Sequence, residues 1–419
     1  MTTARRAAAL WIALACAACG GSAQGAGARA PKVWSDTERA VLATLVLSAR
    51  PAPPPDPGNA EGDDPAAAAL GQVLFADPAL SRNGQISCQT CHRPERAFSD
   101  GLARSVGLGP MLRNAPSLLD IAYQRWFFWD GRADSLWSQA LAPLEQPAEM
   151  GGSRTAIVHR VATEPHLAEL YRRAFGQPPE LRWEDLRLDA GPYGDPAARA
   201  AWSALPEAQR TALSRAFANV GKALAAYERT LRSQPTRFDA YAEAVLAGRD
   251  REAGRLMDAR EVAGLELFLS GRSGCLSCHH GPLFTDGNFH NIGTGEVGTA
   301  SEDLGRARGR ELLRTAEFNC DSPFRDGPGA GNCARSDGGF GTEVQALQRG
   351  AFRTPGLRNL SATAPYLHDG RFATLEQVLE YYRHPADKAA VAHELPRALA
   401  LSDREIADLA RFLRTLAAS

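Results

Sequence analysis

The sequence has no excess of charge of either sign, because 47 lysines and arginines are balanced by 48 aspartates and glutamates among its 419 residues. A formal net charge of −1 gives no field that would favour nucleic acid or an acidic membrane as a partner. Long apolar runs are also missing, and the apolar stretch at residues 7–18 is too short to span a bilayer. The length allows two or three domains with a sizeable core.

The N-terminus has the features of an export signal. Arg5 and Arg6 precede the short apolar stretch, so residues 1–25 are expected to direct the protein to the periplasm. Cys19, which two glycines and a serine follow, is a candidate attachment site for a lipid anchor. The alternative is ordinary signal cleavage near residues 23–28, with no anchor.

A segment rich in alanine, glycine and proline follows the signal. Residues 26–65 are expected to form a tether between the signal and the folded part of the chain. Within it, residues 34–49 have the pattern of a single helix, and Ser35 is its candidate N-cap.

Cysteine is scarce, and four of the eight cysteines occur in two copies of the pattern C-x-x-C-H. This is the attachment pattern of c-type haem, in which two thiols bond to the haem vinyl groups and the histidine ligates the iron. A zinc site would need further cysteines or histidines at similar spacing, and a redox dithiol would need a βαβ context. Neither is present, so the sequence predicts two covalent haems. The copies are Cys88, Cys91 and His92, and Cys275, Cys278 and His279.

Other segments recur in the same order around the two motifs, which indicates two copies of one domain. We expect a mainly α fold of two tandem cytochrome c-like domains, each with one haem and much irregular glycine- and proline-rich chain. Residues 66–245 would hold haem 1, and residues 246–419 would hold haem 2. Residues 211–231 and 403–416 have the helical spacing of closing helices, with Ser402 as an N-cap. The recurring segments are 71–75 with 264–268, 98–101 with 284–287, 113–118 with 353–357, and 129–132 with 368–371.

The repeat also predicts the distal side of each haem. Pro143 lies fourteen residues after Trp129, and Tyr382 lies fourteen residues after His368. Proline has no ligating side chain, so haem 1 is expected to be open, whereas Tyr382 is a candidate ligand of haem 2. None of the four methionines lies there. The alternatives are a packed core tyrosine, with Tyr381, His384 or no residue as the ligand.

Two polar residues lie near Pro143 in the sequence. Gln139 precedes it by one helical turn, and Glu149 follows it by six residues. A carboxylate beside an open haem can take a proton from bound peroxide and return it to the leaving oxygen. Burial would raise the pKa of Glu149 into a useful range. The alternative is that Glu149 is a solvated loop residue.

The motifs around both haems resemble those of the bacterial dihaem cytochrome c peroxidase and MauG family. They include residues 128–132, 135–140, 149–151, 275–286 and 364–370, and the resemblance covers about residues 65–417. The resemblance implies that Gln139 and Glu149 form the peroxidatic pocket and that Trp129 is an electron path between the haems. Simple packing is the alternative for Trp129. The resemblance also implies a calcium ion, held by Asn114 and the carbonyls of Thr363 and Pro365; a turn role is the alternative for Asn114.

Two positions distinguish the branches of this family. Leu108 stands where reductively activated peroxidases carry a loop histidine, and Tyr382 stands where they carry methionine. Both differences resemble MauG, which oxidises residues of a partner protein.

Three functions follow from this resemblance. The first is a peroxidase that reduces hydrogen peroxide, with a small cytochrome c or copper protein as electron donor. The second is a MauG-like oxidation of a protein substrate. The third is a dihaem electron carrier, which Gln139, Glu149 and Pro143 argue against because a carrier gains nothing from an open iron.

Two further cysteines lie in a polar loop of the second half. In an exported protein, Cys320 and Cys333 are expected to form a disulfide. A third metal site is the alternative. His290 is expected to form a hydrogen bond in a loop or at a haem edge rather than to ligate a metal.

Overall fold

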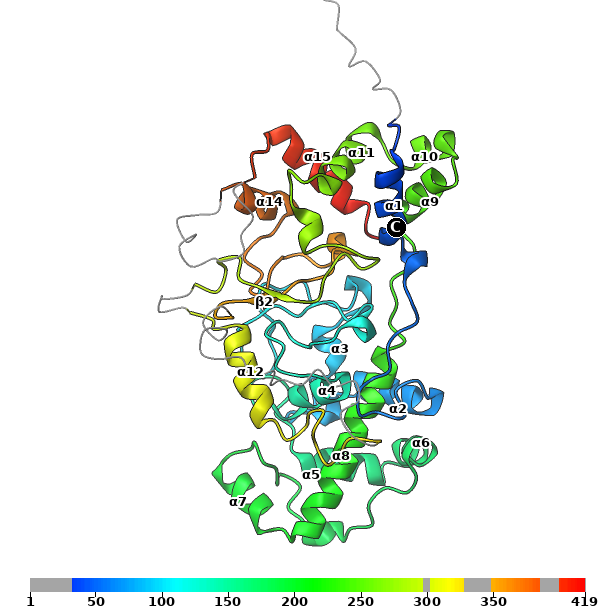
Figure 1. Ribbon diagram of the computed structural model, residues 1–419. Helices are drawn as coiled ribbons and strands as arrows, with labels where there is room; N and C mark the ends of the chain where they lie inside the picture. The colour runs from blue at the N-terminus through cyan, green and yellow to red at the C-terminus, as the bar shows by residue number, and fades with distance from the viewer. Residues whose placement is uncertain (1–31, 297–301, 328–347, 385–398, 419) are drawn as a thin grey trace, which may run out of the picture.

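The computed structural model describes residues 32–296, 302–327, 348–384 and 399–418. In these ranges the protein consists mainly of α-helices joined by long irregular segments (Figure 1). The strands β1 (Phe289–His290) and β2 (Phe352–Arg353) form an antiparallel pair in which Phe289 lies opposite Arg353. The mainly helical fold class predicted from the sequence is confirmed.

The helices of the first half lie together in the lower part of Figure 1. The sequence predicts a closing helix at residues 211–231, and the structure has it as α8 at Glu207–Glu228. Helix α2 crosses α8 at Gly71, where an added Cβ atom would lie 1.9 Å from the carbonyl oxygen of Ala223. Only glycine allows this approach. The helices are α2 (Pro65–Ala76), α3 (Cys88–Cys91), α4 (Leu136–Glu145), α5 (Arg154–Thr163), α6 (Pro165–Phe175), α7 (Pro196–Ala204) and α8.

Most helices of the second half repeat this arrangement in the upper part of Figure 1, where α11 crosses α15, whereas α12 lies lower, level with α4. The predicted closing helix is confirmed, because α15 begins at Asp403 and Ser402 forms a capping box with Glu405. An added Cβ atom at Gly264 of α11 would lie 2.0 Å from the carbonyl oxygen of Asp408. The helices are α9 (Arg237–Leu246), α10 (Asp250–Leu256), α11 (Ala259–Leu269), α12 (Arg306–Thr315), α14 (Leu375–Arg383) and α15 (Asp403–Arg414).

The described part of the expected tether, residues 32–65, packs against both halves instead of hanging free. Helix α1 (Asp36–Leu45) begins after Ser35, whose predicted role as N-cap is confirmed by a capping box with Glu38. The Trp34 indole donates a hydrogen bond of 2.9 Å to the hydroxyl of Tyr241 on α9. Nearer the first half, Asp56 accepts a hydrogen bond of 3.1 Å from the backbone N–H at the start of α4. The segment is held by contacts of its apolar and aspartate side chains, and composition alone does not predict such contacts.

Residues 316–327 follow α12 and lie on the first half; we call them the crossing segment. Glu317 forms an ion pair of 2.7 Å with Arg154, whose side chain is fully buried. Asp326 forms an ion pair of 2.6 Å with Lys222, which is 1% exposed. The Phe318 ring lies edge-on to Trp137 of α4, with ring centroids 6.1 Å apart. The second half therefore supplies counter-charges to α5 and α8, and an aromatic contact to α4, the helix that carries Gln139.

Short 3-10 helices complete the described structure. None of the described helices has both the length and the apolar character needed to cross a membrane. The 3-10 helices are η1 (Leu47–Ala49), η2 (Pro78–Leu80), η3 (Pro94–Arg96), η4 (Ile121–Tyr123), η5 (Trp183–Asp185), η6 (Cys275–Ser277) and η7 (Leu360–Ala362).

Candidate active site

The first C-x-x-C-H motif forms a single helical turn and then turns its histidine inward. Cys88 and Cys91 bound helix α3, and His92 follows at its C-cap. The Nδ1 atom of His92 pairs with the carbonyl oxygen of Phe98 at 2.9 Å. With Nδ1–H donating to that carbonyl, the lone pair of Nε2 is free to ligate a metal, as is usual for metal-binding histidines. Burial lowers the pKa of His92, which also favours the neutral ring.

The second motif has the same construction. Cys275 begins the 3-10 helix η6, and the Nδ1 atom of His279 pairs with the carbonyl oxygen of Phe284 at 2.9 Å. Burial lowers the pKa of His279 as well. None of the four motif cysteines forms a disulfide. Both motifs therefore present two free thiols and one imidazole nitrogen, which is the donor set that a covalent haem requires.

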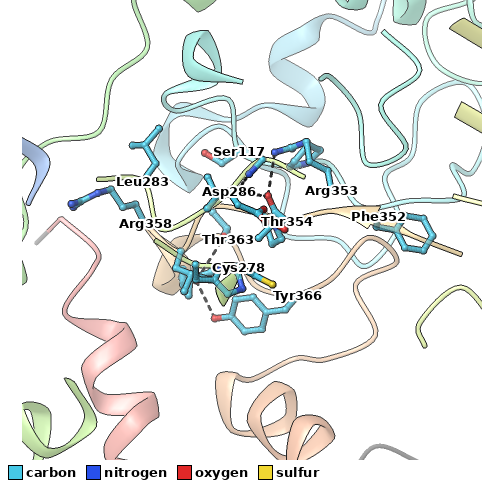
Figure 2. Close-up of a pocket in the computed structure, with 18 of the residues that line it drawn as sticks. Ser117, Cys278, Leu283, Asp286, Phe352, Arg353, Thr354, Arg358, Thr363 and Tyr366 are labelled. Atoms are coloured by element: carbon cyan, nitrogen blue, oxygen red, sulfur yellow. Dashed lines mark hydrogen bonds between the residues drawn. The ribbon is translucent and has the colours of Figure 1, made fainter. Parts of the chain in front are cut away.

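A cavity of about 1020 Å³ opens beside the second motif (Figure 2). Cys275, Cys278 and His279 line it, together with apolar side chains of α14 and α15. Its volume lies at the upper end of the range of small-molecule sites. The cavity and its thiols therefore fit a large covalent cofactor such as haem.

Tyr382 of α14 lines this cavity, as the repeat leads one to expect for a distal residue. Burial raises the pKa of its phenol, and the thiols of Cys275 and Cys278 contribute to the same shift. The two alternative ligands lie elsewhere. The hydroxyl of Tyr381 donates a hydrogen bond of 2.6 Å to the carbonyl oxygen of Ile292, and His384 is 71% exposed. Tyr382 also packs against the core of the second half, so its role as a ligand stays a prediction.

Gln139 and Glu149, the predicted peroxidatic pair, differ in their surroundings. Gln139 lies on α4, and its buried Oε1 atom accepts no hydrogen bond from a described residue. Burial raises the pKa of Glu149, and Arg132 opposes this shift. Glu149 lies close to the first motif, because its charge contributes, after burial and Asp100, to raising the pKa of the Cys91 thiol to about 11. Glu149 therefore lies near the first haem motif, whereas the placing of Gln139 beside it stays a prediction.

The loop that carries Leu108 holds the Glu149 backbone in place. The Leu108 N–H donates a hydrogen bond of 2.9 Å to the carbonyl oxygen of Glu149, and Gly109 bonds in the same way to Ala148 at 2.9 Å. Leu108 itself packs against the core of the first half. The loop therefore contributes two backbone hydrogen bonds and an apolar side chain. It has no histidine that could ligate an iron.

Trp129 lies where the two halves meet. Its indole N–H donates a hydrogen bond of 2.9 Å to the carbonyl oxygen of Asn114. Its own carbonyl oxygen accepts a hydrogen bond of 2.9 Å from the backbone of Arg353, in the second half. Trp129 also lines the large cavity, so it is in reach of both halves, as an electron path between them requires.

The three candidate calcium ligands line the same cavity. Asn114 comes from the first half, whereas Thr363 and Pro365 come from the second. The Asn114 backbone N–H donates a hydrogen bond of 2.8 Å to the carbonyl oxygen of His368. Neutral oxygens gathered at this junction suit a hard cation, so the residues fit calcium, although the ion itself stays a prediction.

The disulfide prediction is only partly covered by the described residues. Cys320 is 2% exposed and disulfide-bonded, and its backbone N–H donates a hydrogen bond of 3.1 Å to Asp134. Cys333 lies outside the described residues. His290 pairs with Asp286 at 2.8 Å, which confirms a hydrogen-bonding role for this histidine.

Sequence reasoning did not single out the arginines at the junction between the halves. Arg113 forms ion pairs with Asp130 at 2.6 Å and with Asp303 at 2.7 Å. Arg353 lines the large cavity. The repeated segments 113–118 and 353–357 each begin with one of these arginines, so the repeat was the signal that would have identified them.

Comparison with known proteins places this arrangement in a family. The family profile described as di-haem cytochrome c peroxidase matches residues 65–245. The chain is 34% identical over 411 residues to the methylamine utilization protein MauG of Methylorubrum extorquens, covering 97% of this chain and 94% of that protein. It is 29% identical over 317 residues to the cytochrome c551 peroxidase of Nitrosomonas europaea, covering 75% and 71%.

Solved structures share the fold. A MauG-like protein associated with microbial copper homeostasis superposes with a TM-score of 0.61 at 26% identity, covering 88% of this chain and 95% of that one. The diheme peroxidase BthA from Burkholderia thailandensis superposes with a TM-score of 0.60 at 25% identity, covering 85% and 87%. With relatives along nearly its whole length, the chain belongs to the di-haem cytochrome c peroxidase and MauG family, and it is a peroxidase-type oxidoreductase with two haem c groups.

Proposed function

We propose that the protein reduces hydrogen peroxide at haem 1, which Cys88 and Cys91 attach and His92 ligates. The observation that carries this proposal is the Glu149 carboxyl, which lies near the first motif and whose pKa burial raises, together with the buried Oε1 atom of Gln139, which accepts no hydrogen bond from a described residue. Buried polar groups without partners are costly, so they are retained where a ligand uses them.

Each residue of the pair has a distinct task. Glu149 would accept a proton from one oxygen of bound hydrogen peroxide and return it to the other, which would leave as water when the O–O bond is cleaved with two electrons from the haem. The Gln139 amide holds the peroxide in the orientation that this transfer needs. Pro143 and Leu108 keep ligating side chains away from the distal side, so peroxide can enter without prior reduction. The haem iron supplies the electron chemistry.

Electrons are proposed to enter at haem 2, which Cys275 and Cys278 attach and His279 ligates, with Tyr382 on the distal side. A small cytochrome c or copper protein is the proposed donor. Trp129 then forms the path between the haems, because its backbone and its indole are bonded to opposite halves.

A second candidate function is MauG-like oxidation of a partner protein. Tyr382 in the cavity of the second motif favours it, because phenolate ligation stabilises ferric and higher iron and makes haem 2 a poor high-potential electron store. The apolar Leu108 in place of a loop histidine points the same way, as does the 34% identity with a protein named MauG.

Several finer features complete the proposal. Residues 1–25 direct export to the periplasm, with Cys19 as a candidate lipid anchor, and Cys320 pairs with Cys333. Calcium is held by Asn114, Thr363 and Pro365 at the junction of the domains at residues 66–245 and 246–419.

Steady-state turnover tests the proposed function. Purified protein is mixed with hydrogen peroxide and a reduced small cytochrome c, and donor oxidation is followed optically. Catalytic oxidation that disappears in a Gln139→Ala, Glu149→Gln double variant with both haems intact supports the peroxidase. If peroxide changes the haem spectra while the wild type oxidises neither a cytochrome nor a copper-protein donor, the MauG-like function is favoured instead.

A further inference from the structure

Arg353 carries a buried charge that no described carboxylate neutralises. It lies on β2 and is 4% exposed, and burial alone lowers the pKa of its guanidinium to about 10. Its side chain donates only two long hydrogen bonds, each of 3.5 Å, to the carbonyl oxygens of Phe128 and Thr354. That distance is at the outer limit for such a bond, so the charge is poorly satisfied.

Other buried arginines in the described parts of the chain have closer partners than Arg353 has. Arg358 lines the same cavity and forms an ion pair of 2.9 Å with Asp239. Arg113, which begins the corresponding segment of the first half, has two aspartates as partners. Arg306 forms no ion pair with a described residue, but it donates a hydrogen bond of 2.5 Å to Gly131 and lies over the Trp126 ring at 4.1 Å.

The position of Arg353 indicates where its missing anion would come from. Arg353 and the motif thiols line one cavity, and Figure 2 shows Arg353 and Cys278 among the side chains around it. A haem bonded at Cys275 and Cys278 is attached through its vinyl-bearing edge. The two propionate carboxylates are on the opposite edge of the ring, so they would lie in the cavity on the side away from the thiols.

We propose that Arg353 binds a propionate of haem 2. A guanidinium and a carboxylate form a charge-assisted, often bidentate, pair that would neutralise both groups. This inference rests on the proposed attachment of haem 2 at Cys275 and Cys278.

Arg353 is therefore a positioning residue for electron transfer as well as a haem-binding residue. Its backbone N–H donates a hydrogen bond of 2.9 Å to the carbonyl oxygen of Trp129, and its guanidinium bonds to Phe128. One residue thus joins the haem 2 carboxylate to the segment that carries the proposed electron path. A shift of the haem 2 propionate would be transmitted directly to that segment.

The test compares Arg353→Gln and Arg353→Lys with the wild type. Resonance Raman spectra report the propionate bending modes, and an optical redox titration gives the potential of each haem. Arg353→Gln should shift a propionate mode and lower the haem 2 potential, because a nearby cation favours the reduced haem. Arg353→Lys keeps the charge, so it should shift the mode while retaining most of the potential.

Arg272→Gln is the matched control, because Arg272 lies three residues before Cys275 but is 60% exposed and pairs with Glu405. It should leave both measurements unchanged. Propionate modes and a haem 2 potential in Arg353→Gln that equal those of Arg272→Gln would overturn the inference. If Arg353→Gln does not fold, an unchanged propionate mode in Arg353→Lys overturns it. Mass spectrometry counts the covalent haems, and a wild type without haem at Cys275 and Cys278 would contradict the proposed function itself.

Discussion

Gly71 of α2 lies so close to Ala223 of α8 that a Cβ atom at Gly71 would stand 1.9 Å from the Ala223 carbonyl oxygen. The same relationship recurs in the second half, where a Cβ atom at Gly264 would stand 2.0 Å from the carbonyl oxygen of Asp408. In each half, the helix that precedes the haem motif therefore crosses the closing helix in the same way. Because the obstacle is a backbone carbonyl, no side-chain rotation can make room for a larger residue.

We expect Gly71→Ala and Gly264→Ala each to lower the free energy of unfolding by about 1–3 kcal/mol, as overpacking in a close contact does. Thermal unfolding of the haem-loaded protein, followed by circular dichroism, measures the change. Gly254→Ala is the control, because Gly254 lies in α10 with no atom within 4 Å of the added carbon. That control should be neutral or slightly stabilising. Equal stability of all three variants would show that the helix crossings tolerate a side chain.

Replacing Glu149 by glutamine should slow the reaction with peroxide by a factor of about 10² to 10⁴, the usual contribution of acid–base help. Burial raises the pKa of Glu149, and only the deprotonated form can accept a proton. The wild-type rate should therefore fall as pH drops through this raised pKa, at a higher pH than an exposed glutamate would give. Stopped-flow absorbance at several pH values measures the rate.

Glu95→Gln is the control for this experiment, because Glu95 is an exposed glutamate of the same half. It should keep the wild-type rate and pH profile. A Glu149→Gln protein with both haems and the wild-type rate would show that Glu149 takes no part in proton transfer.

Replacing Trp129 by phenylalanine should leave the reaction at haem 1 intact but slow electron transfer between the haems. The variant loses the indole and its hydrogen bond of 2.9 Å to Asn114, but it keeps the backbone hydrogen bond from Arg353 that connects the two halves at this point. Rapid mixing of the half-reduced protein with peroxide, with each haem followed at its own wavelength, separates the two steps. Trp126→Phe is the control, because Trp126 lines the same cavity. Unchanged inter-haem transfer in a stable Trp129→Phe protein would leave packing as the role of Trp129.

Replacing Tyr382 by methionine should raise the potential of haem 2, because phenolate favours ferric iron and methionine favours ferrous iron. Tyr382→Phe should remove the sixth ligand or leave a substitute such as water. Redox titration with optical and resonance Raman spectra measures both effects. Tyr381→Phe is the control, since Tyr381 bonds to the carbonyl oxygen of Ile292. A wild type without a phenolate signature, and a haem 2 potential indifferent to Tyr382→Met, would return the protein to the ordinary peroxidase branch.

The local features of this protein could be predicted from its sequence. The two C-x-x-C-H motifs predict covalent haem because the attachment chemistry needs only residues that are adjacent in the chain. Helices starting after Ser35 and Ser402 were predicted correctly, because a cap and its partner lie within one turn. The internal repeat matched glycines, arginines and distal positions between the halves, since duplicated domains keep the same order of elements.

Long-range contacts, in contrast, were decided only by the tertiary structure. Composition predicts a loose tether for residues 26–65, but from residue 32 on this segment packs on both halves through Trp34 and Asp56. Glu317 pairs with Arg154 and Asp326 pairs with Lys222, each from more than a hundred residues away in the sequence. Arg113 and Arg353 each begin a repeated segment, yet among the described residues Arg113 pairs with two aspartates and Arg353 with none. Sequence patterns describe what neighbours along the chain can do, whereas the neutralisation of a buried charge depends on which distant groups folding brings beside it.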